Sequence, residues 1–244
     1  MPVFFIQSQD VVDGTVTITD PLLSHIAKSL RTKPGDALLF NDEQGHRYQT
    51  TVDQITKHQL HATIQQVSAP PLSTRPPLIL AQALLKGEKM GWVIQKATEL
   101  GVSAIVPLMT ERVILKLSGN QGETHRARWN RIALEAAQQS ERWTLPTILP
   151  IQTFQEFLET PRQNPAIFMA EREEGASLLT IPCSTDKSRP GVTVIIGPEG
   201  GWSAGEVEAA QSQNCQFASF GKEILRAETA SLAALAILQA RFNA

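Results

Sequence analysis

Beyond Pro77 the sequence alternates short apolar runs with longer segments of helical periodicity. Strands that are apolar on both faces are typical of parallel sheets covered by helices on each side. The pattern therefore predicts an α/β domain built on a buried parallel sheet. The runs that we assign to its strands are Leu78–Ala81, Ala104–Val106, Ala166–Met169, Val192–Ile196 and Phe217–Ser219.

Two of the intervening segments have the spacing of amphipathic helices, with apolar residues near one face. In residues 88–100 the expected apolar stripe consists of Trp92, Ile94, Ala97 and Leu100. In residues 129–139 it consists of Ile132, Leu134 and Ala136. We expect both stripes to pack against the sheet.

A proline-rich stretch, residues 68–77, separates this region from a different one. Its four prolines favour an extended connector, because proline has a fixed φ and no backbone N–H. We place the domain boundary in this stretch. The sequence then predicts a small domain in residues 1–72 and the α/β domain in residues 73–244.

The small domain is expected to be rich in β-structure. Alternating runs such as Thr15–Thr19 and Leu60–Ile64 favour half-buried strands, and glycine-containing turn signals separate them. One helix is expected at residues 21–30, with Asp20 as its N-cap and Pro21 in its first turn. This pattern predicts a small β-barrel interrupted by one helix.

Composition restricts the partners and the compartment. The net charge of −2 lacks the global basicity of many nucleic-acid binders, so any RNA contact has to be local, as in the basic segments 86–96 and 112–142. Solvated helix faces explain those segments as well. Cys183 and Cys215 form no disulfide or zinc motif, and no apolar stretch is long enough for export or membrane insertion. We expect a cytoplasmic protein without a membrane partner or a metal.

The run Val192–Ile196 leads directly into a glycine-rich segment, Gly197-Pro-Glu-Gly-Gly201. Such a loop at the carboxyl end of a parallel strand is a common ligand site, because glycines let a ligand approach the backbone closely. A strand-to-helix turn that merely needs positive φ is an equally good interpretation. Ser203 and Glu206 then form a capping box that begins a helix. Neither standard glycine motif for nucleotides is present.

A second segment has a turn at Gly221, then the motif Arg226-Ala-Glu-Thr229 and an apolar run that ends at Leu238. The alanine and leucine content of this run predicts a largely buried final helix. Arg226 and Glu228 would stand at its start beside buried backbone, where an unpaired charge is costly. An ordinary structural ion pair explains this spacing as well as a functional role does.

Together these segments resemble a known family. Ile196-Gly-Pro-Glu-Gly-Gly201 followed by Ile224-Leu-Arg-Ala-Glu-Thr-Ala230 is similar to the two signature loops of the bacterial 16S ribosomal RNA (uracil-N3)-methyltransferases, in the SPOUT superfamily. The resemblance spans nearly the whole chain, and residues 25–36 look like the PUA-like amino-terminal domain of that family. Further matches are Lys96–Val102, Thr110–Arg112 and Glu135–Arg142.

The resemblance implies a trefoil-knotted SPOUT domain, in which the C-terminal helix is threaded through a loop, an exception to the rule against knots. It implies a homodimer, and S-adenosylmethionine as the methyl donor held in the knot. The substrate would be N3 of a specific uridine in 16S ribosomal RNA of the small ribosomal subunit. The implied donor-binding residues are Met169, Ala170, Gly197, Glu199, Gly200, Gly201, Phe220, Gly221, Ile224 and Leu225.

In such a reaction the proton on uracil N3 has to leave, and the negative charge that develops on O2 and O4 has to be stabilised. Arg226 is the candidate catalytic residue, because a guanidinium beside the donor loop can orient the base and meet that charge. Glu171, Glu199 and Glu228 are candidate general bases, and water would serve equally well. The candidate RNA-binding residues are Arg31, Lys86, Lys96, Arg112 and Arg142. Each of these is also explained as a solvated surface charge.

Two features depart from the family pattern. Val3 stands where the family often has an arginine, and the loop Asn41–Gly45 is more acidic than we expect for RNA contact. Two other functions stay open: a SPOUT methyltransferase acting on another RNA base or a ribose hydroxyl, and a non-catalytic RNA-binding assembly factor. The intact glycine loops and Arg226 disfavour the second of these.

Overall fold

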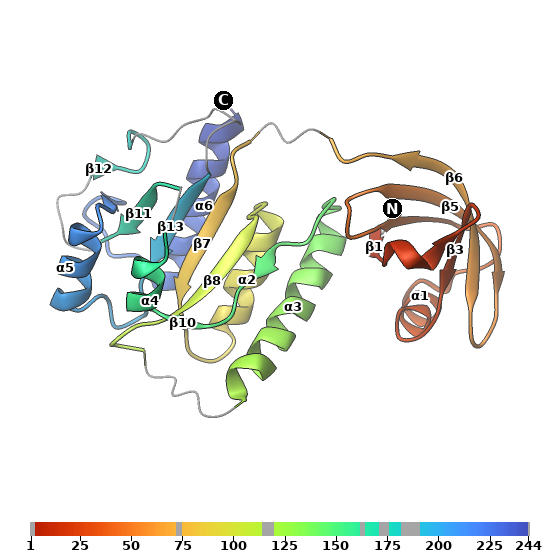
Figure 1. Ribbon diagram of the computed structural model, residues 1–244, viewed down its shortest axis with the longest axis horizontal. Helices are drawn as coiled ribbons and strands as arrows, with labels where there is room; N and C mark the ends of the chain where they lie inside the picture. Colours follow the sequence, from red (N-terminus) through yellow and green to blue (C-terminus); the bar gives the residue numbers. More distant parts are fainter. Residues whose placement is uncertain are drawn as a thin grey trace. The chain divides into compact units, whose positions relative to one another are not determined.

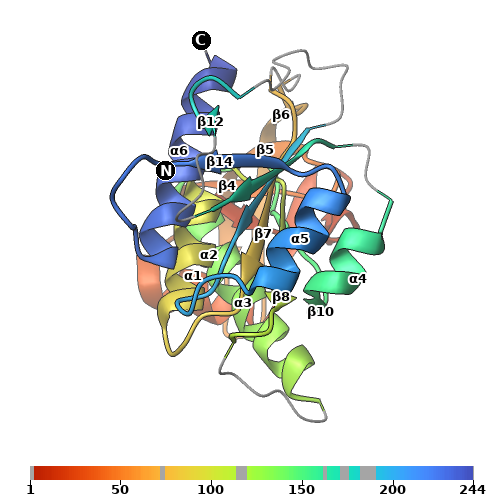
Figure 2. The ribbon, with the colours of Figure 1, turned by 90° about the vertical axis from the view of Figure 1, so that its left-hand side faces the viewer.

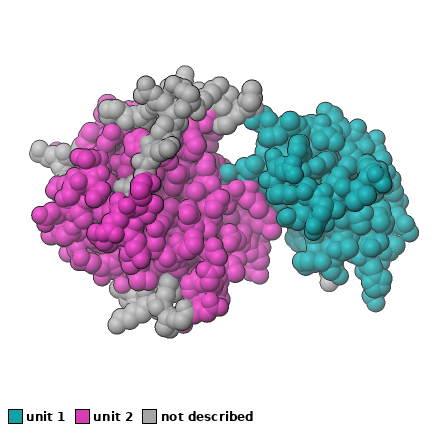
Figure 3. Space-filling model, viewed as in Figure 1, with its two compact units in different colours: residues 1–72, 137–144 teal, residues 73–136, 145–244 magenta. Residues whose placement is uncertain are grey.

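The computed structural model of the chain (Figure 1) describes residues 3–71, 75–113, 120–161, 164–170, 176–181 and 191–243. Two compact units are present (Figure 3): residues 1–72 with 137–144, and residues 73–136 with 145–244. Each unit has its own hydrophobic core. Glu171 and Cys183 lie outside the described residues.

The small unit is a six-stranded sheet with one α-helix. The strands follow the order β1-β4-β5-β6-β3-β2, and all neighbours are antiparallel except β1 and β4. Alternate strand residues and one face of the helix α1 (Leu22–Leu30) form its core. The strands are β1 (Val3–Phe5), β2 (Val11–Val12), β3 (Thr15–Ile18), β4 (Ala37–Asn41), β5 (Arg47–Ile55) and β6 (Leu60–Ser68), and a short 3₁₀ helix, η1 (Ser8–Asp10), precedes β2.

Helix α1 begins one residue later than the sequence predicts. It starts at Leu22, and the Asp20 carboxylate accepts hydrogen bonds from the backbone N–H of Ser24 (3.0 Å) and from its hydroxyl (2.5 Å). The predicted N-cap is therefore wrong by one residue: Pro21 occupies that position, and Asp20 bonds the first turn from one position further out.

In the acidic loop Asn41–Gly45, the carboxylate of Asp42 is hydrogen-bonded to other residues of the small unit. Asp42 is buried and accepts hydrogen bonds from the Tyr48 hydroxyl (2.8 Å) and from the backbone N–H groups of Gln44 (2.9 Å) and His46 (2.8 Å). Burial and the bond to Asp42 raise the pKa of Tyr48 to about 12. The acidity that departs from the family pattern thus holds the loop itself in shape.

Side chains of β4 and β5 hold the segment 137–144 in the small unit. The Asn41 amide donates to the carbonyl oxygens of Arg142 (2.8 Å) and Trp143 (3.2 Å). Arg47 donates to the side-chain oxygen of Asn41 (2.9 Å), and its guanidinium lies 4.0 Å from the centroid of the Trp143 ring. The stretch Glu135–Arg142, one of the matches to the family, therefore ends in a segment that belongs to the small unit.

The large unit contains the predicted buried parallel sheet. Its strands follow the order β10-β8-β7-β13-β11-β14-β12, with β9 also paired to β8, and every pair is parallel. All five predicted runs are strands. The bounds are β7 (Leu78–Ala83), β8 (Ala104–Met109), β9 (Thr147–Ile148), β10 (Gln152–Thr153), β11 (Ala166–Met169), β12 (Ala176–Ser177), β13 (Val192–Ile196) and β14 (Gln216–Ser219).

Helices cover both faces of this sheet (Figure 2), with α2 and α6 on one side and α4 and α5 on the other. Successive residues of β13 alternate between two cores: Val194 and Ile196 face α2 and α6, while Ile195 faces α4 and α5. None of the helices in the described ranges is long and apolar enough to cross a membrane. The helices are α2 (Lys89–Glu99), α3 (Gln121–Gln139), α4 (Phe154–Glu159), α5 (Ala204–Ser212) and α6 (Ala227–Asn243).

The apolar stripe predicted for residues 88–100, which contain α2, is wrong at Trp92. The side chain of Trp92 is 42% exposed. Trp92 and Ile94 are two positions apart, about 200° around a helix, so they cannot face the same core. The helical period, rather than the size of the side chain, decides the buried face. That face consists of Met90, Val93, Ile94, Ala97 and Thr98.

A buried polar pair joins the central strand β7 to α6. The Ser231 hydroxyl lies 2.5 Å from the side-chain oxygen of Gln82 and 2.8 Å from the carbonyl oxygen of Ala227, and it has one proton to donate to them. Gln82 and Ser231 are both fully buried. Because buried polar groups are costly without a partner, this pair restricts how α6 lies on β7.

We expect Ser231→Ala to lower the free energy of unfolding by about 1–3 kcal/mol, because the buried Gln82 oxygen loses its donor. The double variant Ser231→Ala, Gln82→Met should recover part of the loss, since it removes both polar groups. Urea denaturation followed by circular dichroism measures both. Wild-type stability in Ser231→Ala would show that the pair contributes nothing.

Candidate functional site

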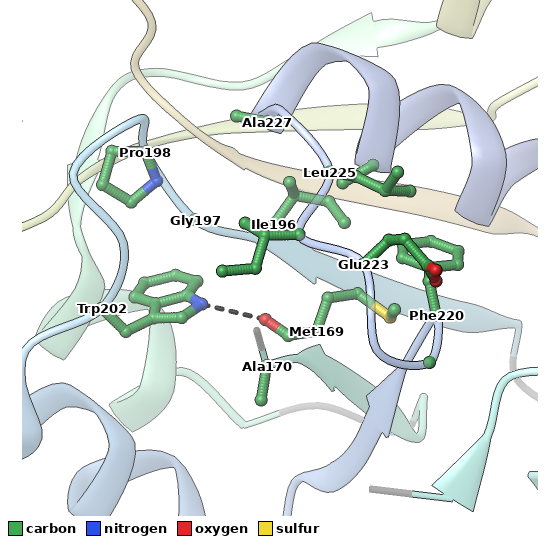
Figure 4. A pocket seen from close by; sticks show the side chains of 13 residues that line it. Met169, Ala170, Ile196, Gly197, Pro198, Trp202, Phe220, Glu223, Leu225 and Ala227 are labelled. Atoms are coloured by element: carbon green, nitrogen blue, oxygen red, sulfur yellow. Dashed lines mark hydrogen bonds between the residues drawn. The ribbon is translucent and has the colours of Figure 1, made fainter. Parts of the chain in front are cut away.

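A hollow opens at the carboxyl ends of three neighbouring strands, β13, β11 and β14 (Figure 4). The space between its walls that protein atoms do not fill is about 480 Å³, part of which is open to solvent. Its walls are the segments that follow these strands and the first turn of α6. Among the described residues, no group of His, Cys, Asp or Glu side chains is arranged to hold a metal ion.

Most residues predicted for a donor site lie together in this hollow. The predicted residues that line it are Met169, Ala170, Gly197, Phe220, Gly221, Ile224 and Leu225. Glu199, Gly200 and Gly201 belong to the same loop as Gly197 but are not part of the lining. The other lining residues are Pro198 and Glu223, which lie between predicted residues of the same loops, and Ile196, Trp202, Ala227 and Ala230, which sequence reasoning missed. Of these, Ala227 and Ala230 carry a sequence signal, because they are three positions apart on one helix face.

Trp202 forms a wall of the hollow and is fixed by several contacts. Its indole N–H donates to the carbonyl oxygen of Met169 at 3.1 Å, the dashed line in Figure 4. Its ring packs against Phe154 and Phe168, with centroids 4.9 and 4.6 Å away. A Cβ atom at Gly197 would lie 2.9 Å from the indole. The position of Trp202 therefore requires glycine at residue 197.

The other two glycines of the loop have different physical reasons. Gly201 has a φ of +69°, which a side chain would strain. Gly200 has no such angle, but a Cβ there would lie 3.1 Å from the Cβ of Arg112, whose guanidinium donates to the Gly200 carbonyl oxygen at 3.1 Å. Gly201 therefore makes a turn, and Gly197 borders the hollow.

The predicted capping box of Ser203 and Glu206 is present. The Ser203 hydroxyl accepts from the Glu206 N–H (3.2 Å), and the Glu206 carboxylate accepts from the Ser203 N–H (2.9 Å). The other oxygen of this buried carboxylate accepts from the N–H of Glu111 (2.9 Å), which follows β8. One side chain therefore ties the helix after the glycine loop to the segment Thr110–Arg112.

Glu199 and Glu228 share one cation. The Lys89 ammonium, at the start of α2, lies 3.3 Å from Glu199 and 3.4 Å from Glu228. Burial opposes the ionisation of Glu199, but hydrogen bonds from its own N–H and that of Lys86 (3.2 Å), together with the Lys89 charge, bring its pKa below the ordinary value. Glu228 therefore forms its ion pair with Lys89 of α2. Among the described residues, no ion pair joins Glu228 to Arg226, two positions before it.

Arg226 directly precedes α6, between the lining residues Leu225 and Ala227. Its side chain is exposed and is not part of the lining. Its carbonyl oxygen accepts the N–H of Ala230 at 2.8 Å, a bond of the first helical turn. The backbone of Arg226 is therefore fixed beside the hollow, while its guanidinium is at the surface.

The candidate RNA-binding residues are divided between the two units. Lys86 and Arg112 are both exposed, and each is hydrogen-bonded to the glycine loop, Lys86 through its backbone N–H and Arg112 through its guanidinium. Lys96 is engaged in an ion pair within α2 (2.8 Å), and Arg31 is exposed at the end of α1. Burial lowers the pKa of Arg142 to about 10, so this partly buried guanidinium still carries its charge at neutral pH.

Two family models match the chain: an RNA methyltransferase domain at residues 73–239, and an RNA methyltransferase PUA domain at residues 18–65. The first match includes all the residues that line the hollow. The second includes α1, β4 and β5 of the small unit. Fold and site therefore define an RNA methyltransferase with an amino-terminal PUA domain.

Curated relatives and solved structures narrow this class. The ribosomal RNA small subunit methyltransferases E of Synechocystis and Bacillus subtilis are 34% and 30% identical to this chain, over 95% and 92% of it and 75% and 89% of their own lengths. The crystal structure of the Neisseria gonorrhoeae enzyme of that name, bound to S-adenosylmethionine, is 31% identical with a TM-score of 0.87, covering 99% of this chain and 98% of that one. A Legionella pneumophila methyltransferase in complex with the same cofactor is 26% identical with a TM-score of 0.88, covering 98% and 97%. This chain belongs to the ribosomal RNA small subunit methyltransferase E family, as its sequence motifs predict.

We expect Gly197→Ala to displace the Trp202 ring, because the added methyl group would lie 2.9 Å from it. Overpacking of this kind costs about 1–3 kcal/mol of stability. The indole N–H signal of Trp202 in a ¹H–¹⁵N NMR spectrum should shift strongly. The control Gly205→Ala adds its methyl group in helix α5, 3.8 Å from the nearest atom, and should leave the signal in place. An unmoved Trp202 signal in Gly197→Ala would contradict this account of the loop.

Proposed function

We propose that this protein transfers the methyl group of S-adenosylmethionine to N3 of a specific uridine in 16S ribosomal RNA of the small ribosomal subunit. The observation that carries the proposal is the hollow at the carboxyl ends of β13, β11 and β14, formed by both signature loops of the family. The relatives' names support ribosomal RNA as the substrate, and two similar structures hold the donor.

The lining suits this donor in shape and charge. Ile196, Leu225 and Phe220 supply apolar surface for a flat adenine ring. Backbone groups at the turn of Gly221, where φ is +107°, are close enough to the hollow to bond the polar edge of the ring. The Glu223 carboxylate is exposed at the rim, where it would attract a positively charged donor.

When bound, the donor supplies an electrophilic methyl group on a sulfonium. The chain has to hold the uracil against it and stabilise the charge left when the N3 proton departs. We assign the second role to Arg226, which the first turn of α6 fixes beside the hollow. A carboxylate with a lowered pKa is a weak base, so Glu199 is poorly suited to remove the proton.

The resemblance supports the remaining parts of the proposal. Helix α6 would be threaded through a trefoil knot, the active form would be a homodimer, and the protein would act in the cytoplasm, where ribosomes are assembled. The exposed pair Lys86 and Arg112, bonded to the glycine loop, would meet RNA phosphates close to the donor. Arg31, Lys96 and Arg142 are proposed as further contacts to a folded RNA.

Methylation of small ribosomal subunits from a strain that lacks the modification tests the substrate. Nucleoside digestion and mass spectrometry should show one 3-methyluridine per 16S ribosomal RNA, and a short uridine oligomer should be a poor substrate because specific RNA recognition needs folded structure. A methyl group on another base or on a ribose would replace the proposed acceptor. Absence of S-adenosylmethionine binding in calorimetry would overturn the proposed methyltransferase activity.

For Arg226→Ala we expect kcat to fall by about 10²–10³, the scale for loss of one preorganised charge-stabilising donor. Donor affinity should change little, because the charge on uracil develops only in the transition state. Arg226→Lys should recover part of the loss, since lysine provides a mobile point charge without a planar fork. Residual activity of Arg226→Ala should rise with pH as hydroxide removes the N3 proton. Loss of donor binding alone would instead place Arg226 in the donor site.

A further inference from the structure

Lys89 connects two segments that line the hollow but lie far apart in sequence. Its ammonium is 3.3 Å from the Glu199 carboxylate and 3.4 Å from the Glu228 carboxylate. Glu199 lies in the loop after β13, two residues beyond Gly197, and Glu228 follows the lining residue Ala227 in the first turn of α6. One side chain from α2 thus contacts both signature loops of the site.

The side chains that form the two ion pairs of Lys89 are partly shielded from solvent. The exposed fractions of the side chains are 38% for Lys89, 28% for Glu199 and 16% for Glu228. Fully exposed pairs contribute little, whereas loss of one partner from a buried pair is costly. The Oε2 atom of Glu228 is buried and has no hydrogen-bond partner among the described residues, so Lys89 is what offsets the desolvation of this carboxylate.

The two carboxylates are held unequally. Glu199 also accepts the backbone N–H of Lys86 at 3.2 Å, and the N–H of Lys89 in turn donates to the Lys86 carbonyl at 3.3 Å. The turn of residues 86–89 therefore holds Glu199 by backbone as well as by side chain. Without the ammonium, Glu228 would lose its cation and face the negative charge of Glu199.

The rest of α6 is anchored independently of Lys89. Ser231, one turn further along, is bonded to Gln82 of the central strand, and the helix continues into the core through Leu235 and Leu238. Removal of the ammonium would therefore act on the first turn of α6 and on the glycine loop, and leave the packing of the sheet in place. This separates a local effect on the site from a general loss of stability.

We propose that Lys89 is a positioning residue of the donor site, whose ammonium holds the glycine loop and the first turn of α6 together through Glu199 and Glu228. The proposal rests on the proposed function, because it concerns the hollow in which S-adenosylmethionine would bind. Lys89 does not line that hollow, so it acts through the two loops and not by contact with the donor.

Three variants test the role of Lys89. Lys89→Met removes the charge and keeps the aliphatic stem, Lys89→Arg keeps the charge, and Arg126→Met removes the cation of the Arg126–Glu123 ion pair on α3, away from the hollow. Hydrogen exchange measured without donor should be faster in residues 197–201 and 224–228 of Lys89→Met alone. Calorimetry should show S-adenosylmethionine binding weakened about tenfold in Lys89→Met, intermediate between exposed and buried ion pairs. Lys89→Arg should restore most of it.

The outcomes separate this inference from the proposed function. Unchanged hydrogen exchange and donor affinity in Lys89→Met would overturn it. So would a loss of affinity that Lys89→Arg fails to rescue, or one that accompanies a general loss of protection across the central strands. If the wild-type protein does not bind S-adenosylmethionine, the proposed function fails, while the exchange experiment still decides whether Lys89 holds the two loops.

Discussion

The parallel pairing of the large sheet is the constraint on which the site depends. Because every strand runs in the same direction, the segments that leave β13, β11 and β14 all emerge at one edge. Parallel strands also have to be buried on both faces, which requires a helix layer on each side and gives α6 its place. The hollow is therefore a consequence of strand order and direction, and the residues that line it come from segments widely separated in sequence.

Beyond the ends of the strands, ladder hydrogen bonds no longer hold the chain, and individual side chains take over that role. Trp202 donates to the carbonyl oxygen of Met169, and Lys89 joins Glu199 to Glu228. Glu206 accepts the N–H of Ser203, just after the glycine loop, and that of Glu111, which follows β8. These contacts give an irregular region defined positions without filling it with side chains. A preorganised site of this kind does not have to be ordered when a ligand binds, which lowers the cost of binding.

The small unit shows how a chain with a net negative charge can belong to a family that acts on RNA. Asp42, the buried acid of the loop Asn41–Gly45, accepts hydrogen bonds from Gln44, His46 and Tyr48 of the same unit. In the large unit, Lys86 and Arg112 stand beside the glycine loop with exposed side chains. Charge balance over the whole chain is therefore a poor guide to RNA contact, because the electrostatic potential at a site depends on the few charges nearest to it.

The sequence by itself determined the alternation of strands and helices, the capping box of Ser203 and Glu206, the family, and seven residues that line the hollow. The alternation and the capping box follow from periodicity and spacing, which are local properties of the chain, whereas the lining residues were implied by the resemblance of its motifs to the family. Only the tertiary structure decided that Trp202 forms a wall and that Glu228 pairs with Lys89. Each of these depends on where elements distant in sequence meet, and that is set by packing over the whole sheet, which no local pattern encodes.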